Sequence, residues 1–348
     1  MKLIMENWRR YMTEGGNVEG MGELSPIALK NIRPTLDAYI VELDRLFPDH
    51  AGIFKSFNPV GSVGKADESG DIDLVVDAKD MFKNREVTPE EMESWNVHPE
   101  DWQVEFNKLK PRATRRTDSE IGWRAFLILL AKYMSDNSDL IETARWQKIG
   151  DSAIFSSFPQ YDAQGNDLEL RVQVDWMIGN RQWLSFAYFS DHPSRTEPML
   201  KGLHRTQFIL AMFLAKNHAF SHTRGVRDKE TDQYVATTQE QATDLLGNLY
   251  DGQVENEDLY NFPNLYQWLR KNASEEDMNR AIDVYLMILD RTNANKERGR
   301  ISGKKVRCGY IPKILEDYWL KHRERLKLKG KFLCRDANAK LWSAVNES

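Results

Sequence analysis

Apolar side chains near the start of the chain recur at the spacing expected for one face of a helix. They include Ile27, Ile32, Leu36, Ile40, Leu43 and Leu46. Ser25-Pro26 precedes this run, and serine followed by proline is typical of a helix start, with serine as the N-cap and proline in the first turn. We therefore expect a helix from Ser25-Pro26 to Phe47, where Pro48 ends it.

Farther along the chain, the spacing of apolar residues changes to the patterns of β-strands. Four segments predict strands, at residues 53–60, 72–76, 153–158 and 168–178. Residues 61–70 are rich in turn-forming residues, and residues 162–166 (Asp-Ala-Gln-Gly-Asn) predict a hairpin between the last two strands. A helical pattern beginning at Trp123 separates the two pairs of strands.

Two regions differ from this strand-rich part. Residues 83–120 are polar and contain three prolines, so we expect an excursion or insertion here rather than core. After about residue 195 helical spacing dominates, at residues 199–220, 239–249, 262–271, 275–291 and 312–327. We predict an α+β fold, with a mixed sheet flanked by helices in residues 1–195 and a mainly helical domain in residues 196–348.

The composition is that of a soluble globular protein. Hydrophobic residues make up 41% and charged residues 29% of the 348 residues, and no apolar run approaches the roughly 20 residues that span a bilayer. Charge interrupts the N-terminus too early for a secretory signal. Two cysteines, Cys308 and Cys334, are too few for a disulfide framework, so we expect reduced thiols. These features predict a cytoplasmic protein without a membrane partner.

Charge is distributed unevenly along the chain. Residues 291–340 contain 16 basic and 5 acidic side chains, whereas the rest of the chain contains 32 basic and 48 acidic ones. Such asymmetry favours a localised surface for a polyanion. The alternative is a lysine-rich helical face that only contacts solvent.

The stretch from Val60 to Asp77 carries the candidate chemistry. Asp71 and Asp73 stand two apart in a predicted strand, so their side chains share one face and lie about 6.6 Å apart along the strand. Two such carboxylates repel each other unless a cation lies between them. Hard divalent ions with oxygen ligands, Mg²⁺ above all, are the usual partners. Upstream, Gly61-Ser62 can bring backbone N–H groups and a hydroxyl against a phosphate.

This arrangement resembles the signature of the DNA polymerase beta-like nucleotidyltransferase superfamily, over roughly residues 25–190. The family pattern is a hydrophobic residue, Gly, then Gly or Ser, a spacer, and Asp, a hydrophobic residue, and Asp or Glu. Here it reads Val60-Gly61-Ser62, eight residues, then Asp71-Ile72-Asp73-Leu74. The spacer is at the short end for the family.

The resemblance implies a third carboxylate on a later strand beside the first pair. Residues 170–177 alternate strictly, and Asp175 is the carboxylate near the middle of the polar face. In another register, Asp167 or Glu169 would replace it. With three carboxylates the family's two-metal chemistry applies: one ion activates the attacking hydroxyl and the other neutralises the triphosphate. The expected cofactor is Mg²⁺ or Mn²⁺, and the substrate an NTP, ATP first among them.

The resemblance also suggests residues that contact the nucleotide. Lys65 falls where many members have a basic residue. In eukaryotic poly(A) polymerases, archaeal CCA-adding enzymes and oligoadenylate synthetase-like members, a helical domain supplies a lysine and a polar turn. Lys216, late in an apolar helical stretch, and the following Ser221, Thr223 and Arg224 are the candidates here. Alternatively, Lys216 reaches solvent and the turn only ends the helix.

The leading function is transfer of a nucleoside monophosphate to the 3′-hydroxyl of RNA, with release of pyrophosphate. Lys304, Lys305 and Arg307 are the expected RNA contacts, and the nearby Tyr310 supplies an aromatic ring for stacking on a base. The alternatives are nucleotidylation of a protein or small molecule, and a non-catalytic virion or binding protein on the same scaffold. Residues 1–9 resemble tailed-phage proteins, which would place the chain in the host cytoplasm. Protein partners are not indicated.

Overall fold

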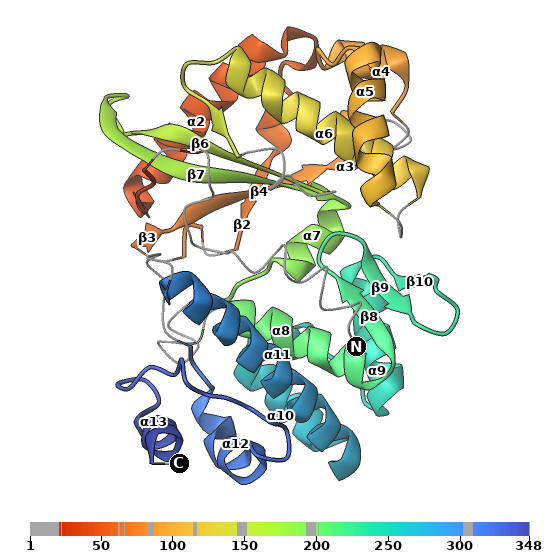
Figure 1. Cartoon of the computed structure of the whole chain (residues 1–348), viewed down its shortest axis with the longest axis vertical. Helices are drawn as coiled ribbons and strands as arrows, with labels where there is room; N and C mark the ends of the chain where they lie inside the picture. The colour runs from red at the N-terminus through yellow and green to blue at the C-terminus, as the bar shows by residue number, and fades with distance from the viewer. Residues whose placement is uncertain are drawn as a thin grey trace. The chain divides into compact units, whose positions relative to one another are not determined.

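The computed structural model describes residues 21, 23–61, 63–65, 67–82, 87–113, 117–144, 152–192, 200, 202–301 and 309–347, except for the side chains of Arg112 and residues 295–301. Of these residues, those up to Ser185 form one compact unit, and those from Phe186 onward form a second (Figure 1). None of the described helices combines the length and the apolar character needed to cross a bilayer.

A mixed five-stranded sheet forms the centre of the N-terminal unit, in the order β2-β4-β7-β6-β5. Strands β4 and β7 run parallel, and the other neighbours are antiparallel. A separate two-stranded sheet pairs β1 with β3. The strands are β1 (Ile27–Ala28), β2 (Asn58–Val60), β3 (Glu68–Ser69), β4 (Asp71–Asp77), β5 (Glu142–Thr143), β6 (Ala153–Tyr161) and β7 (Asp167–Gly179).

Helices α2 and α6 cover one face of this sheet (Figure 1). The helices of the unit are α2 (Leu29–Leu46), α3 (Ala78–Met81), α4 (Pro89–Ser94), α5 (Pro99–Leu109) and α6 (Asp118–Asp136), and α7 (Arg181–Ala187) spans the boundary between the units. Alternate residues of β4 and β7, such as Leu74 and Trp176, are buried in the core cluster on the helix side. Their polar neighbours in sequence therefore point to the other face.

The start of helix α2 differs from the prediction. The helix begins at Leu29, and its N-cap residue is Ala28, which makes no side-chain capping hydrogen bond. Ser25 instead donates its backbone N–H to the Arg171 carbonyl, while Ile27 and Ala28 pair with β3. The serine-proline signal was therefore overridden by pairing with distant segments of the chain.

Two other local predictions are wrong. The strand predicted at residues 53–60 is a 3-10 helix from Ile53 to Ser56, and only Asn58–Val60 is extended. The polar segment 83–120 contains helices α4 and α5, and it supplies Trp95, which is fully buried, to the core cluster. Whether the segment is an insertion relative to other proteins stays a prediction. The predicted hairpin is confirmed, since Asp162 and Asn166 close the turn between β6 and β7.

The C-terminal unit combines helices with a three-stranded antiparallel sheet in the order β10-β9-β8. Helices α8 and α11 pack against each other, with the rings of Phe208 and Tyr285 edge to face. The elements are α8 (Gly202–Ala215), β8 (His218–Ser221), β9 (Gly225–Asp228), β10 (Tyr234–Ala236), α9 (Gln239–Tyr250), α10 (Phe262–Asn272), α11 (Glu275–Ile301), α12 (Glu316–His322) and α13 (Ala339–Asn346).

The predicted helix bounds in this unit need correction. The helix expected at residues 199–220 ends at Ala215, because the chain then turns into β8. The helix expected to end at residue 291 continues to Ile301, and the one expected at residues 312–327 is the short α12. The prediction of a mixed sheet flanked by helices, followed by a mainly helical region, is confirmed.

The expectation of reduced thiols is wrong for Cys334, which is disulfide-bonded. The only other cysteine of the sequence, Cys308, lies outside the described residues. Gly309 and Leu333 form a β-bridge, which brings two segments together that are far apart in the sequence. The number of cysteines could not predict that the segments of Gly309 and Leu333 meet, because only folding brings them together.

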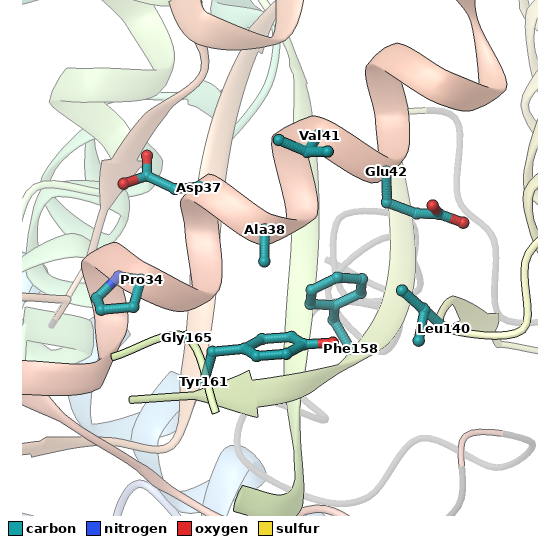
Figure 2. Close-up of a pocket in the computed structure, with 9 residues that line it drawn as sticks. All are labelled: Pro34, Asp37, Ala38, Val41, Glu42, Leu140, Phe158, Tyr161 and Gly165. Atoms are coloured by element: carbon teal, nitrogen blue, oxygen red, sulfur yellow. The ribbon is translucent and has the colours of Figure 1, made fainter. Parts of the chain in front are cut away.

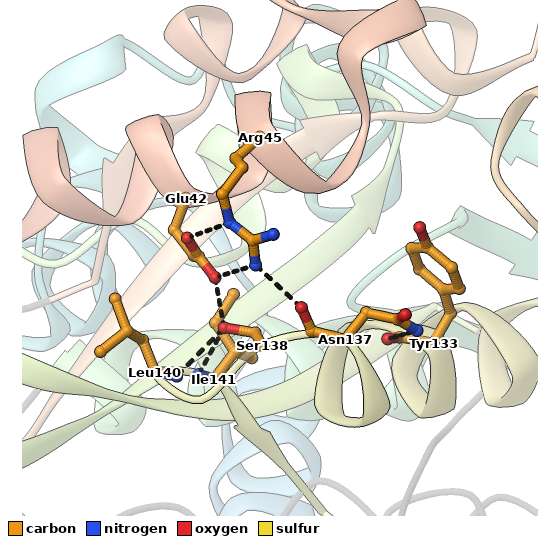
Figure 3. A network of polar contacts seen from close by, with 7 residues as sticks. All are labelled: Glu42, Arg45, Tyr133, Asn137, Ser138, Leu140 and Ile141. Carbon is orange, nitrogen blue, oxygen red and sulfur yellow. Dashed lines mark hydrogen bonds and ion pairs between the residues drawn. The ribbon is translucent and has the colours of Figure 1, made fainter.

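A polar network joins helix α2 to the turn that follows α6 (Figure 3). The Arg45 guanidinium donates from Nε and Nη2 to the two carboxylate oxygens of Glu42, at 2.8 and 2.7 Å, and from Nη2 to the Asn137 carbonyl at 2.8 Å. The Ser138 hydroxyl also donates to Glu42. The hydrogen bonds from Arg45 lower the pKa of Glu42 below its ordinary value. Glu42 therefore ties two distant segments together.

Glu42→Gln should lower the free energy of unfolding by about 1.5–3 kcal/mol at pH 7, because a charged acceptor is lost while its donors remain. Since the folded pKa is lowered, this stability is present above the unfolded pKa of about 4.3 and is lost as the pH falls through the folded value. Urea unfolding across this pH range should therefore show the two proteins converging in acid.

Asp37→Asn is the matched control on the same helix. Asp37 pairs with Arg33, but the two side chains are 53% and 84% exposed. Exposed pairs contribute little, so we expect a change below about 0.5 kcal/mol. Equal destabilisation by the two substitutions would contradict the tying role of Glu42.

Candidate active site

The two strands that carry the candidate carboxylates lie side by side. The parallel register of β4 and β7 pairs Asp71 with Gln173 and Asp73 with Asp175. Neighbouring strands are about 4.8 Å apart and paired residues point to the same face. Asp73 and Asp175, which are 102 positions apart in the sequence, are therefore direct neighbours, and Asp71 lies two residues before Asp73 on the same face of β4.

The side of the sheet that carries these carboxylates is the one opposite to helices α2 and α6. Asp71 and Asp73 are half-buried, whereas Asp175 is only 3% exposed. Burial of a carboxylate requires a compensating partner, and Nε2 of Gln173 donates to Oδ2 of Asp175 at 2.7 Å. The face thus concentrates negative charge around one buried and hydrogen-bonded member.

The loop before β4 approaches the carboxylates closely at one glycine. Gly61 has a φ of +69°, in the left-handed region that favours glycine. A Cβ atom at this position would lie 2.8 Å from Oδ2 of Asp73. A side chain at this position would therefore push against the Asp73 carboxylate, so the close approach of the backbone favours glycine. Lys65 is half-buried in the turn that follows, and Ser62 lies outside the described residues.

The donor set fits a hard divalent cation in kind, since carboxylate oxygens are the preferred ligands of Mg²⁺. The register of β4 and β7 brings two carboxylates into adjacent positions with a third beside them, and the backbone at Gly61 comes close to Asp73. In the described part of the chain, however, no three His, Cys, Asp or Glu side chains already form a group that could hold a metal ion. The carboxylates are therefore neighbours, but they do not form a complete metal-binding site.

A pocket of about 410 Å³ lies elsewhere on the N-terminal unit, between helix α2 and the β6–β7 hairpin (Figure 2). Its walls include Val41, Leu140, Phe158 and Tyr161. Phe158 pairs with Val172, which points to the helix side, so the pocket belongs to the face opposite to Asp175. It is therefore separate from the candidate active site.

The structure gives Lys216 partners of its own in the C-terminal unit. Lys216 lies in the turn after α8 rather than within the helix. Its Nζ forms an ion pair with Oδ1 of Asp277 at 2.7 Å and lies 5.0 Å from the centre of the Tyr250 ring. The alternative that Lys216 simply reaches solvent is therefore wrong. Its contact with a nucleotide stays a prediction.

The other predicted nucleotide contacts lie in the β8–β9 hairpin. Ser221 ends β8, and its Oγ accepts a hydrogen bond from the Thr223 backbone N–H at 3.4 Å. Thr223 is buried, and Arg224 is half-buried in the same turn. The prediction of a turn here is correct, but it connects two strands instead of ending a helix.

The predicted RNA contacts receive only a partial description. Lys304, Lys305 and Arg307 lie outside the described residues. Tyr310 is described and is 5% exposed, with its ring edge-on to His204 at a centroid distance of 5.9 Å. The expectation that the Tyr310 ring stacks on a base is therefore wrong, because the ring is buried inside its own unit.

Sequence reasoning missed two polar residues on the carboxylate face. Gln173 received no role, although its position two residues before Asp175 indicated the same face. Asp77 also shares the face of Asp71 and Asp73, but it caps helix α3 by accepting the Lys79 N–H, and it accepts the Arg181 N–H as well. Asp77 therefore has a structural role. The sequence signal for this capping role was the position of Asp77 at the junction of a strand and a helix.

Comparisons with known proteins add little to this geometry. No protein-family model matches the sequence, and no curated protein is detectably similar to it. Among solved structures, the chain is similar to the crystal structure of Leishmania infantum polymerase beta in a ternary P/T complex. The identity is 12%, the match covers 74% of this chain and 77% of that chain, and the TM-score is 0.31. A TM-score of this size does not establish a shared fold.

Proposed function

We propose that this chain is a metal-dependent nucleotidyltransferase that transfers a nucleoside monophosphate from an NTP to a hydroxyl acceptor. The observation that supports it most is the pairing of Asp73 with Asp175 on adjacent parallel strands, with Asp71 beside them. Like charges at neighbouring positions repel each other, and a bound divalent cation relieves this repulsion.

In this proposal Asp71, Asp73 and Asp175 hold divalent ions, with Mg²⁺ or Mn²⁺ as the candidates. Bound ions would lower the pKa of the acceptor hydroxyl and neutralise charge on the triphosphate. The Gly61-Ser62 turn and Lys65 would contact the phosphates, because a glycine permits close approach of backbone N–H groups. Lys216, Ser221, Thr223 and Arg224 are the other residues proposed to contact the nucleotide.

The proposed reaction is a single displacement at phosphorus. The acceptor oxygen forms a bond to the α-phosphorus and loses its proton, while the bond from that phosphorus to the bridging oxygen breaks and pyrophosphate leaves. The basic segment 291–340 favours an RNA 3′ end as the acceptor. ATP is the first NTP to test. A phage origin, and a host-cytoplasmic location with it, is a further part of the proposal that residues 1–9 support.

The function is tested by incubating the protein with each α-³²P-labelled NTP, Mg²⁺ or Mn²⁺, and total RNA. We expect label in material that ribonuclease removes and that Asp73→Asn fails to produce. Label in a protein band or a small molecule would replace RNA as the acceptor while keeping the chemistry. Absence of label from every acceptor, with either metal, would contradict the enzyme assignment and favour a binding role.

Gly61→Ala should reduce transfer by about a hundredfold, since a displacement of about 1 Å near the chemistry has effects of that order. The physical reason is the 2.8 Å approach between the new Cβ and Oδ2 of Asp73. Gly64→Ala is the matched control, because Gly64 has a φ of +75° and no atom within 4 Å of the corresponding Cβ position. Both alanines carry a similar backbone strain of roughly 1–2 kcal/mol.

Steady-state transfer rates and melting temperatures of the two variants separate the effects. The melting temperatures should fall by similar amounts, whereas only Gly61→Ala should lose activity. Equal activities of the two variants would show that the close approach to Asp73 is unimportant.

A further inference from the structure

Gln173 occupies the fourth position of the carboxylate group. The register of β4 and β7 places three carboxylates and this one amide at four neighbouring positions on one sheet face, with Gln173 directly beside Asp71. Gln173 is 6% exposed and Asp175 is 3% exposed. The hydrogen bond from Nε2 of Gln173 to Oδ2 of Asp175, at 2.7 Å, is therefore shielded from competing water.

We propose that Gln173 is a positioning residue, whose amide holds the Asp175 carboxylate in the orientation that binds a divalent metal ion. The inference rests on the proposed function, because it takes Asp175 as a metal ligand. A metal ion bound to Oδ1 of Asp175 would leave the hydrogen bond from Gln173 to Oδ2 intact. Groups that orient metal ligands in this way commonly affect metal affinity by about 10–100-fold.

The side chain of Gln173 has the right chemistry for this role. It is neutral, so it adds no fourth negative charge beside Asp71 and Asp175, and its NH₂ group donates to a carboxylate. An apolar residue would remove a hydrogen bond to a buried charged group, which has an unfavourable energy. Glutamate would add a like charge in a group that already repels itself.

Polar residues flank Gln173 on the same face of the sheet. Ser157, which is fully buried, is its register partner on β6. Arg171, two residues earlier on the same face, donates from Nε to the Ser157 hydroxyl at 3.1 Å and from Nη2 to the Leu140 carbonyl at 2.7 Å. A row of polar residues therefore lies beside Gln173 on this face of the sheet. The burial of Gln173, at 6% exposure, limits the rotamers open to its side chain.

Two substitutions test the proposal, with Mn²⁺ alone as the probe and its free concentration followed by electron paramagnetic resonance. Gln173→Met keeps the length of the side chain without the amide, and Gln173→Asn keeps the amide but is one methylene too short. Both should weaken Mn²⁺ binding by about 10–100-fold. Both should also raise the Mn²⁺ concentration needed for half-maximal transfer, and added Mn²⁺ should restore much of the rate.

Gln160→Met is the matched control on the same sheet. Gln160 is 1% exposed, and its amide donates to the carbonyls of Ser25 and Pro26 at 3.1 and 3.2 Å rather than to a carboxylate. This substitution should lower the melting temperature and leave Mn²⁺ binding unchanged. A merely structural role of Gln173 would produce the same pattern as Gln160.

The outcomes separate this inference from the proposed function. If wild type binds Mn²⁺ and transfers nucleotide, and both Gln173 variants match it in Mn²⁺ affinity and Mn²⁺ requirement, the positioning role is wrong and the enzyme assignment stands. If Gln173→Asn alone matches wild type, polarity and not positioning matters, and the proposal fails. If wild type neither binds Mn²⁺ nor transfers nucleotide, the proposed function fails first.

Discussion

Asp71→Asn and Asp73→Asn should each reduce nucleotide transfer by more than about a hundredfold, because the loss of a metal ligand exceeds the 10–100-fold effects of the groups that orient ligands. Asparagine keeps the size of the side chain and removes its negative charge. In the absence of metal, the neighbouring carboxylates repel each other across β4 and β7. The melting temperature of each variant in EDTA should therefore equal or exceed that of wild type.

Adding Mn²⁺ should raise the melting temperature of wild type and have little effect on the two variants. Ligand binding to the folded state alone stabilises it by mass action. Measured together, rate and melting temperature distinguish a missing metal ligand from a damaged fold. A fall in both, with no difference in metal response, would indicate that the aspartates act in folding.

Asp77→Asn provides the matched control for these two substitutions. Asp77 lies on the same strand and face, but its carboxylate accepts backbone N–H groups from Lys79 and Arg181. Asparagine is about as good an N-cap as aspartate, so Asp77→Asn should retain transfer and stability. If Asp71→Asn or Asp73→Asn kept wild-type turnover, the substituted residue would not belong to the active site.

Reversing the charge of Lys304, Lys305 and Arg307 together should weaken RNA binding strongly. Each phosphate neutralised on a single strand adds roughly 0.7 to the slope of log affinity against log salt, so the triple variant should flatten that slope by up to about 2. NTP binding should remain, because the triple variant changes none of the residues proposed to contact the nucleotide. Fluorescence anisotropy with a labelled single-stranded RNA at several salt concentrations measures both affinity and slope.

Charge reversal at Lys321, Lys329 and Lys331, three exposed lysines of the same basic segment, controls for net charge. A smaller effect of this triple variant would locate the contact at residues 304–307, whereas equal effects would indicate diffuse attraction. If the first triple variant instead loses thermal stability and keeps its RNA affinity, the cluster pairs with acidic groups of the protein itself. In that case a protein or a small molecule becomes the favoured acceptor.

The sequence alone was sufficient for the features that depend on local periodicity. The alternation in residues 71–77 and 170–177 predicted that Asp71 and Asp73 share a face and that Asp175 belongs to the polar side of its strand. The hairpin at residues 162–166 followed from turn-forming residues. These predictions succeed because the face to which a side chain points depends on its own strand and on no distant partner.

The tertiary structure alone decided which distant segments meet. The parallel register that pairs Asp73 with Asp175, and Gln173 with Asp71, depends on how two strands slide past each other. The pattern within either strand does not determine this register. It is fixed when Leu74 and Trp176 pack into the core on the face covered by helices.

The same physical reason explains the predictions that failed. Ser25 looked like a helix cap but bonds Arg171, and Tyr310 looked like an exposed stacking ring but is buried against His204. A local preference such as that of an N-cap residue contributes only about 0.5–2 kcal/mol. Contacts between segments far apart in the sequence, summed over a buried core, outweigh such preferences, and these contacts exist only in the folded chain.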